Sequence, residues 1–299
     1  MRKPNFLLIG AMKSGTTTVY EDLRHHPEIG FSHVKEPARL QDPHVLSAQG
    51  SASYFQLFSD VQHKSIIGDA SPQYSFAPGF PDTALHAKQL LGPDLRLAYL
   101  MRDPIRRAIS HHYHIYSRGG CGSDFVEENR RMGIFENYGR YGMQLERWLE
   151  QYPLEQLICF KFEDYMDNRE HHARQLVSFV GLDAAQLPAA EGVHNVGEAS
   201  REPGFMSWIS ARFPSARARI ADLASQDPTG TWSRLRGLLY QPPKERPPAP
   251  PRSELERLAE VFEKDHAVLK RCLGDATPSW DLKKTVMKLS ESRSAHTSL

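Results

Sequence analysis

The sequence has little of what marks secreted, membrane-spanning or nucleic-acid-binding proteins. Its three cysteines, Cys121, Cys159 and Cys272, are scattered along 299 residues, which excludes a disulfide framework and favours a reducing compartment. No apolar run approaches the length of a membrane span. Lysine and arginine number 37 against 36 aspartates and glutamates, so no global basic field attracts nucleic acid. We therefore expect neither a nucleic-acid nor a membrane partner.

A signal peptide and internal repeats are also missing. The start of the chain, Met-Arg-Lys-Pro-Asn, is not followed by an apolar core long enough for secretion. With 40% hydrophobic and 24% charged residues, the composition is typical of a soluble globular protein. The length suits one large α/β domain with a sizeable core. These features predict a cytoplasmic protein, and they leave its oligomeric state open.

The strongest positive signal is the stretch from Phe6 to Thr18. Four apolar residues, Phe6 to Ile9, are typical of a buried parallel strand, and Gly10 and Gly15 bracket the loop that follows. Three threonines then open a helix that we expect to run to about His26. A strand, a glycine-rich turn and a helix N-terminus form an anion cradle, because free N–H groups and the positive end of the helix dipole face one point.

The position of the lysine separates this loop from a nucleotide-triphosphate P-loop. Such a loop has lysine directly after its second glycine, where this chain has Thr16. Lys13 is the loop's one lysine and lies two residues before Gly15. It would approach a bridging oxygen rather than a terminal pair of phosphates. The sequence therefore predicts a relative of the P-loop, although a nucleotide kinase remains an alternative.

A second motif runs from Leu100 to His111. The segment Leu95–Met101 is apolar and predicts another strand, and Pro104 suits the first turn of a helix. Arg102 leaves the strand end, and Ser110 lies about two turns along that helix. Both could therefore reach one phosphate group, the arginine as a charged fork.

Together the two motifs resemble those of sulfotransferases that use 3′-phosphoadenosine 5′-phosphosulfate (PAPS). Leu-Ile-Gly-Ala-Met-Lys-Ser-Gly-Thr-Thr is similar to the family's 5′-phosphosulfate loop, and Arg-Asp-Pro with its downstream serine is similar to the 3′-phosphate motif. The resemblance implies PAPS as donor, 3′-phosphoadenosine 5′-phosphate (PAP) as product, and no metal. It implies the following cofactor contacts: Lys13, Ser14, Gly15, Thr16, Thr17, Thr18, Arg102 and Ser110. Many animal members carry an N-terminal Golgi anchor, so its absence here implies a soluble, bacterial cytoplasmic enzyme.

The remaining pattern predicts a P-loop-like parallel sheet with helices on both faces in a single domain. We expect further strands at Ile66–Asp69 and Leu157–Phe162, and helices at Gly139–Gln151 and Ala173–Val180. The stretch Gln241–Pro251 is too rich in proline to be helical, and Ser253 is expected to cap a final amphipathic helix. The resemblance extends to Trp280. We therefore place the domain at residues 1–282 and a mobile polar tail at 283–299.

Two residues are candidates for the chemistry of sulfuryl transfer. Lys13 would stabilise the leaving oxygen, since its ammonium is a compact charge inside the cradle; the alternative is a lysine solvated on a surface turn. The resemblance to carbohydrate-type sulfotransferases maps a glutamate base onto Glu36 of Val-Lys-Glu-Pro. Glu36 is followed by Ala-Arg-Leu rather than the family's histidine and aromatic residue, which argues against a glycosaminoglycan acceptor. An exposed glutamate paired with Lys35 is the alternative.

Other residues are weaker candidates for a catalytic or binding role. His111 is an alternative base, facing the acceptor. His111, His112 and His114 lack a carboxylate or cysteine to complete a metal site. Ala70 stands where the family often has a second catalytic lysine, and Arg201 resembles a loop that closes over the 3′-phosphate in relatives.

The sequence leaves the acceptor open. Three variable loops, 38–61, 74–83 and 113–138, are expected to form the acceptor cleft. The last two carry several aromatic residues: Phe76, Phe80, Tyr113, Tyr116, Phe125 and Phe135. A small apolar molecule and a saccharide with a free hydroxyl are therefore both candidates, with secondary metabolism as one setting. A PAPS-binding protein without catalysis remains a third possibility beside sulfotransferase and kinase.

Overall fold

The computed structural model describes residues 1–188 and 245–297, with side chains up to residue 292. The predictions for Arg201 and for most of the stretch 188–251 fall outside these residues. Residues 245–251 are described and lie outside helices and strands, as their prolines predict.

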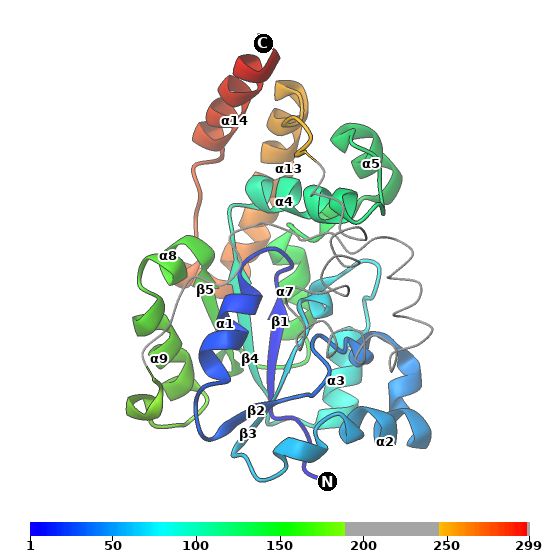
Figure 1. Ribbon diagram of the computed structural model, residues 1–299, viewed down its shortest axis with the longest axis vertical. Coiled ribbons are helices and arrows are strands. Elements are labelled where there is room, and N and C mark those ends of the chain that lie inside the picture. The colour runs from blue at the N-terminus through cyan, green and yellow to red at the C-terminus, as the bar shows by residue number, and fades with distance from the viewer. Residues whose placement is uncertain (189–244, 298–299) are drawn as a thin grey trace, which may run out of the picture.

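The described residues form one five-stranded parallel sheet in the order β2-β3-β1-β4-β5. Its strands are β1 Phe6–Gly10, β2 Ile29–Phe31, β3 Ile66–Ala70, β4 Arg96–Met101 and β5 Leu157–Lys161. The two predicted motif strands, β1 and β4, are neighbours at the centre (Figure 1). Their carboxyl ends therefore lie at the same edge, where parallel sheets bind ligands.

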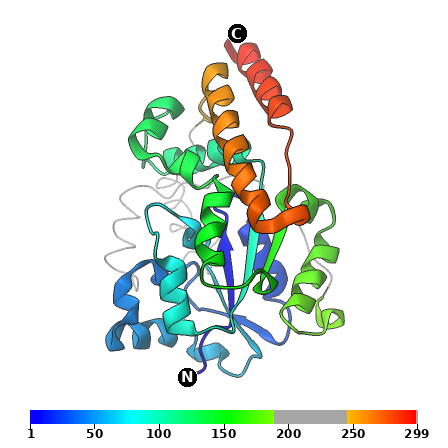
Figure 2. The same cartoon turned by 180° about the vertical axis from the view of Figure 1, so that it is seen from behind.

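Alternating side chains of the central strands build a core on each face of the sheet. Leu7 and Ile9 pack into one core, whereas Phe6 and Leu8 pack into the other. Helices on the first face are α2 Ala48–Gln56, α3 Thr83–Leu91, α7 Tyr141–Leu149 and part of α13 Arg252–Leu273. Helices on the second face are α1 Thr16–Leu23, α8 Phe162–Asp167 and α9 Arg169–Phe179. Both layers are visible in Figures 1 and 2, so the expected sheet with helices on both faces is confirmed.

Further helices lie beyond the carboxyl ends of the strands (Figure 1). They are α4 Pro104–Ser117, α5 Phe125–Met132, α6 Ile134–Asn137, the start of α13 and α14 Leu282–Thr297, and they share a third core. Short 3₁₀ turns occupy Arg39–Gln41, Pro43–Leu46, Ser59–Val61, Pro72–Ser75, Leu154–Gln156, Ala184–Gln186 and Gly274–Ala276.

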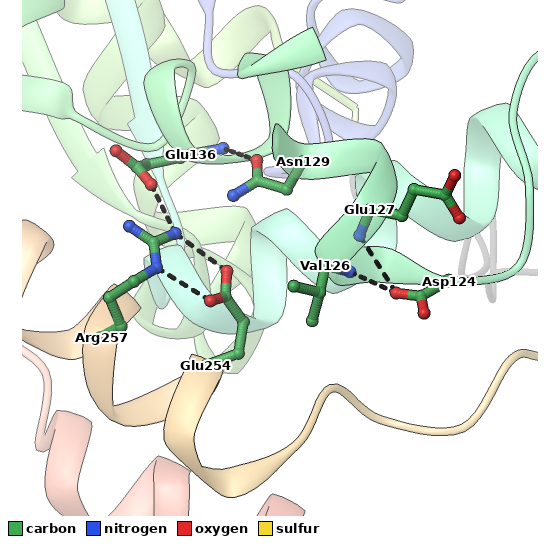
Figure 3. A network of polar contacts seen from close by, with 7 residues as sticks. All are labelled: Asp124, Val126, Glu127, Asn129, Glu136, Glu254 and Arg257. Atoms are coloured by element: carbon green, nitrogen blue, oxygen red, sulfur yellow. Dashed lines mark hydrogen bonds and ion pairs between the residues drawn. The ribbon is translucent and has the colours of Figure 1, made fainter. Parts of the chain in front are cut away.

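A polar network joins three of these helices (Figure 3). Arg257 of α13 binds both carboxylate oxygens of Glu254 and reaches Oε2 of Glu136 in α6 at 2.7 Å. The backbone N–H of Glu136 donates to Asn129 of α5, and Asp124 caps the start of that helix. Two carboxylates raise the pKa of Arg257, so the guanidinium remains charged and links α13 to α6.

Two local expectations were wrong, and one strand was missed. Ser253 is not a helix cap, because α13 already begins at Arg252 after Pro251. The strand β2 was not anticipated, since three residues are too few for a period to show. The expected mobile tail instead forms α14, in which Leu282, Val286 and Leu289 pack into the third core. Their spacing of four and three residues is the helical signal that the polar composition concealed.

Candidate functional site

The loop between β1 and α1 can follow its path only because it has glycine at both ends. Gly15, the residue before α1, has φ 87°, and a Cβ there would lie 2.7 Å from the Phe162 ring. A Cβ on Gly10 would lie 2.2 Å from the Ser75 hydroxyl. A side chain at either position would therefore displace the loop.

The backbone of this loop presents donors at the start of α1. The N–H groups of Ser14 and Thr18 bond to carbonyl groups within the loop. Those of Gly15, Thr16 and Thr17 have no acceptor among the described residues. The side chains of Ser14, Thr16 and Thr18 are buried, whereas that of Thr17 is half-buried. These N–H groups and hydroxyls fit the 5′-phosphosulfate end of PAPS, the cofactor predicted from the sequence.

Lys13 holds its charge in a crowded, cationic position. Its ammonium lies 3.5 Å from Nδ1 of His114 in α4. Burial, then the charges of Arg118 and Arg102, lower the pKa of Lys13 below its ordinary 10.5, while the charge of Glu36 raises it. Burial and the Lys13 and Arg118 charges lower the pKa of His114 to about 3, so its neutral ring can accept from the ammonium. An anion at Lys13 would relieve the repulsion between these cations.

Arg102 leaves the end of β4 beside the same loop. Its Nη1 lies 3.5 Å from the Lys13 carbonyl oxygen, and its guanidinium stacks over Phe162, 4.9 Å from the ring centroid. The hydroxyl of Tyr141 donates to the Arg102 carbonyl at 2.7 Å and accepts from the Arg102 N–H at 3.2 Å. Among the described residues, no carboxylate lies within 4.0 Å of the charged groups of Lys13 or Arg102. Two such cations suit an anionic ligand.

Arg107 is a structural part of the site that the sequence analysis missed. It is fully buried, and its guanidinium donates to the carbonyl groups of Met12, at 3.5 Å, and Phe135. The loop's shape thus depends on α4 as well as on its own glycines. The available signal was a second arginine, after Arg106 and before Ala108 in the predicted helix, and this pattern does not name its partners.

Glu36 lies in a strained turn near the cradle. Its φ is 53°, and Oε2 accepts a 3.0 Å hydrogen bond from Nε2 of Gln73. The Glu36 charge acts on both Lys13 and Asp69, which brings the predicted base and the predicted lysine into one site. Gln73 was not anticipated, because no local pattern indicates a partner so far along the chain.

A buried carboxylate anchors the turn that carries Glu36. Asp69 at the end of β3 accepts hydrogen bonds from the hydroxyls of Tyr54, Tyr74 and Ser71. The Ser71 hydroxyl in turn accepts the N–H of Ala38 at 3.1 Å. Burial raises the pKa of Asp69. The three hydrogen bonds oppose this rise, and the Glu36 charge adds to it. Ser71 therefore connects the Glu36 turn to the sheet.

The structure places the other predicted residues less decisively. Ser110 is half-buried in α4, eight residues along the chain from Arg102, and their shared phosphate contact stays a prediction. His111 is buried, lies 3.4 Å from Arg107, and has a pKa held well below 6.5 by burial and by that charge. His112 contacts the Gly122 carbonyl. No cluster of three or more metal-ligating residues occurs in the described part of the chain.

The expected acceptor loops are partly helical. They contain α2, α5 and α6, and Phe125 and Phe135 are buried in the third core instead of lining a cleft. Phe76 stacks on Tyr138 with ring centroids 3.9 Å apart. Of the aromatic residues expected there, Phe80 is 42% exposed.

A central parallel sheet with helices on both faces, and a glycine-bracketed loop that leads into a helix, define a P-loop-like α/β protein. The chain belongs to the sulfotransferase family: the family model "Sulfotransferase domain" matches residues 3–197. This confirms the resemblance found in the two motifs.

Individual relatives are distant. Carbohydrate sulfotransferase 15 of Mus musculus is 25% identical over 249 residues, which cover 60% of this chain and 44% of the relative. Heparan sulfate glucosamine 3-O-sulfotransferase 3A1 of Mus musculus is 26% identical over 191 residues, covering 60% and 46%. The chain thus spans less than half the length of these curated relatives.

A solved structure supports the fold. The sulfotransferase from Alicyclobacillus acidocaldarius superposes with a TM-score of 0.57 at 22% identity, covering 78% of this chain and 100% of the other. Within the described residues, every helix is too short or too polar to cross a bilayer.

Proposed function

We propose that this protein is a PAPS-dependent sulfotransferase that acts on a hydroxyl group of a saccharide or small-molecule acceptor. One observation carries the proposal. Lys13 lies in the loop that leads to three backbone N–H groups without an acceptor among the described residues. Its carbonyl oxygen lies 3.5 Å from Nη1 of Arg102, and the Glu36 charge raises its pKa. A cation for the leaving group and a carboxylate for the incoming group are what this transfer requires.

The residues of the two motifs would hold opposite ends of the donor. The N–H groups of Gly15, Thr16 and Thr17, with Lys13 and the threonine hydroxyls, fit its 5′-phosphosulfate end. Arg102 and Ser110 are the candidates for its 3′-phosphate. When bound, PAPS supplies a sulfuryl group, whose bond to the 5′-phosphate oxygen breaks as a bond to the acceptor oxygen forms.

Glu36 would take the proton that the acceptor hydroxyl loses. Its hydrogen bond from Gln73 fixes one carboxylate oxygen and leaves the other for the acceptor. Lys13 would balance the charge that develops on the departing phosphate oxygen. His111 suits the role of base less well, because its ring is 3% exposed and its pKa is well below 6.5.

The proposal also covers the chemical class of the acceptor. Curated relatives are carbohydrate and heparan sulfate sulfotransferases, which favours a saccharide hydroxyl. Phe80, which is 42% exposed, would equally suit an apolar small molecule. We also propose a cytoplasmic location and a role in secondary metabolism.

The test combines binding and transfer. Titration with PAP should show tight binding by the wild type and weaker binding by Lys13→Ala and Arg102→Ala. Lys264→Ala is the matched control, since Lys264 is exposed on α13. Unchanged affinity in both site variants would refute the proposed site.

Transfer is measured with radiolabelled PAPS and a panel of hydroxyl acceptors. Glu36→Gln should retain PAP affinity and lose about 10²-fold or more in transfer rate, because the amide cannot accept the proton. Undiminished transfer would remove Glu36 as base. Magnesium-dependent binding of ATP in place of PAP would indicate a kinase, and PAP binding without transfer to any acceptor would indicate a binding protein.

A further inference from the structure

The C-terminal part of the chain makes a buried contact with the Arg-Asp-Pro motif. The hydroxyl of Thr285 in α14 donates a 2.6 Å hydrogen bond to Oδ2 of Asp103. Asp103 is 4% exposed and Thr285 is 7% exposed. The family model ends at residue 197, so this contact comes from beyond the matched region. Figures 1 and 2 show α14 running back alongside α13, away from the sheet, and Leu282 and Val286 near its start share the third core with α4.

A second contact reaches the same point. Nε1 of Trp280 donates to Oε2 of Glu163 at 3.0 Å, and Oε1 of Glu163 accepts the backbone N–H of Asp103 at 3.1 Å. The Trp280 ring also lies against Tyr141, with centroids 5.9 Å apart. Tyr141 is the residue whose hydroxyl holds the Arg102 backbone. Trp280 thus contacts both Glu163 and Tyr141, the two residues that bond to the main chain of the motif.

These contacts give hydrogen-bond partners to the Asp103 carboxylate and to the backbone of Arg102 and Asp103. Oδ1 of Asp103 caps the N–H of Arg106 at the start of α4, while Oδ2 is taken by Thr285. The N–H and carbonyl of Arg102 and the N–H of Asp103 each have a partner outside the motif. Since a side chain leaves from its own backbone, this support determines where the Arg102 guanidinium points.

We propose that the segment from Trp280 to Val286 is a positioning element for Arg102, and through Arg102 for the 3′-phosphate of the nucleotide. Thr285 and Trp280 are positioning residues that act through Asp103 and Glu163. The inference rests on the proposed function, because it assigns the 3′-phosphate to Arg102. It adds a role for a part of the chain that the family match does not include.

A purely structural role gives a different expectation. Leu282 and Val286 also pack in the third core, so loss of α14 packing would lower stability and weaken every ligand alike. A positioning role instead affects the 3′-phosphate selectively. Adenosine 5′-monophosphate separates the two roles, since it keeps the adenosine and 5′-phosphate of PAP but lacks the 3′-phosphate.

The experiment measures Kd for PAP and for adenosine 5′-monophosphate by calorimetry on full-length variants. Thr285→Val should weaken PAP binding about five- to tenfold, the scale of one ordinary net hydrogen bond. Binding of adenosine 5′-monophosphate should change less than twofold. Trp280→Phe, which keeps a ring but lacks the N–H donor, should also weaken PAP binding. Thr285→Ser, which keeps the hydroxyl, should bind PAP as tightly as the wild type.

Two controls complete the design. Thr277→Val removes a hydroxyl that lies just before this segment and bonds to the Gly274 carbonyl, and Leu289→Ala removes α14 packing beyond the segment without removing a hydrogen bond. Neither should change the preference for PAP. Equal loss of both ligands in Thr285→Val and Trp280→Phe, or no loss in either, would overturn the positioning role. A wild type without any preference for PAP would overturn the 3′-phosphate assignment itself, and with it the proposed function.

Discussion

Nε2 of Gln73 donates a 3.0 Å hydrogen bond to Oε2 of Glu36. A carboxylate can only accept, so the bond identifies the amide nitrogen of Gln73 and fixes the orientation of the carboxylate. The Glu36 charge raises the pKa of Lys13, so Gln73 orients a carboxylate that acts on the anion cradle.

Replacing Gln73 should therefore lower the rate of transfer. Gln73→Ala leaves the Glu36 carboxylate without the hydrogen bond that orients it, and Gln73→Glu places a second carboxylate beside it, which repels it. We expect both variants to lower kcat, the second more strongly, with PAP affinity unchanged. Transfer assays and PAP titrations measure the two effects, and an unchanged kcat in both variants would contradict the role of Gln73.

Ser71 should affect activity through the turn that it anchors. Ser71→Ala leaves the Ala38 N–H and one Asp69 oxygen without their partner, which should reduce the free energy of unfolding by about 1–2 kcal/mol. It should also lower kcat, because the Glu36 turn loses its connection to β3. Ser51→Ala is the control, since that exposed hydroxyl bonds to the Ala48 carbonyl within α2. Denaturant unfolding and transfer assays measure the two effects, and equal kcat in both variants would argue against the anchor.

Gly15 offers a test of the loop itself. Gly15 and Gly181 have nearly the same φ, 87° and 86°. An added Cβ at Gly181 meets nothing within 4 Å, whereas at Gly15 it meets Phe162 at 2.7 Å. Gly181→Ala should therefore cost about 1 kcal/mol of stability from backbone strain alone, with PAP affinity intact. Gly15→Ala should also lose PAP affinity, and equal affinity in the two variants would contradict the close contact as the reason for glycine.

The lowered pKa of Lys13 predicts how binding depends on pH. Burial and the nearby arginines lower that pKa, and a bound phosphate dianion would raise it again. PAP affinity should thus fall as pH rises through the lowered pKa of the free protein, and binding should take up protons in that range. Titrations in buffers of different ionisation enthalpy measure this uptake. Lys13→Arg should abolish it, because arginine stays protonated; an identical uptake in that variant would assign the effect elsewhere.

The central strands, the cradle and Arg102 could be predicted because their signals are local. Apolar runs, glycine spacing and a proline in the first helical turn act between neighbouring residues. The contacts of Asp103 with Thr285, and of Arg102 with Tyr141, join residues far apart in sequence, where spacing carries no information. The same reason explains why Gln73 was missed. The structure of α14 could have been found, since Leu282, Val286 and Leu289 follow a helical period.

The central claim is that one nucleotide spans both motifs, and a crystal structure with PAP tests it most directly. We expect the 5′-phosphate against the N–H groups of Gly15, Thr16 and Thr17, close to Lys13, and the 3′-phosphate against Arg102. PAP bound elsewhere, or with its 3′-phosphate away from Arg102, would contradict the account.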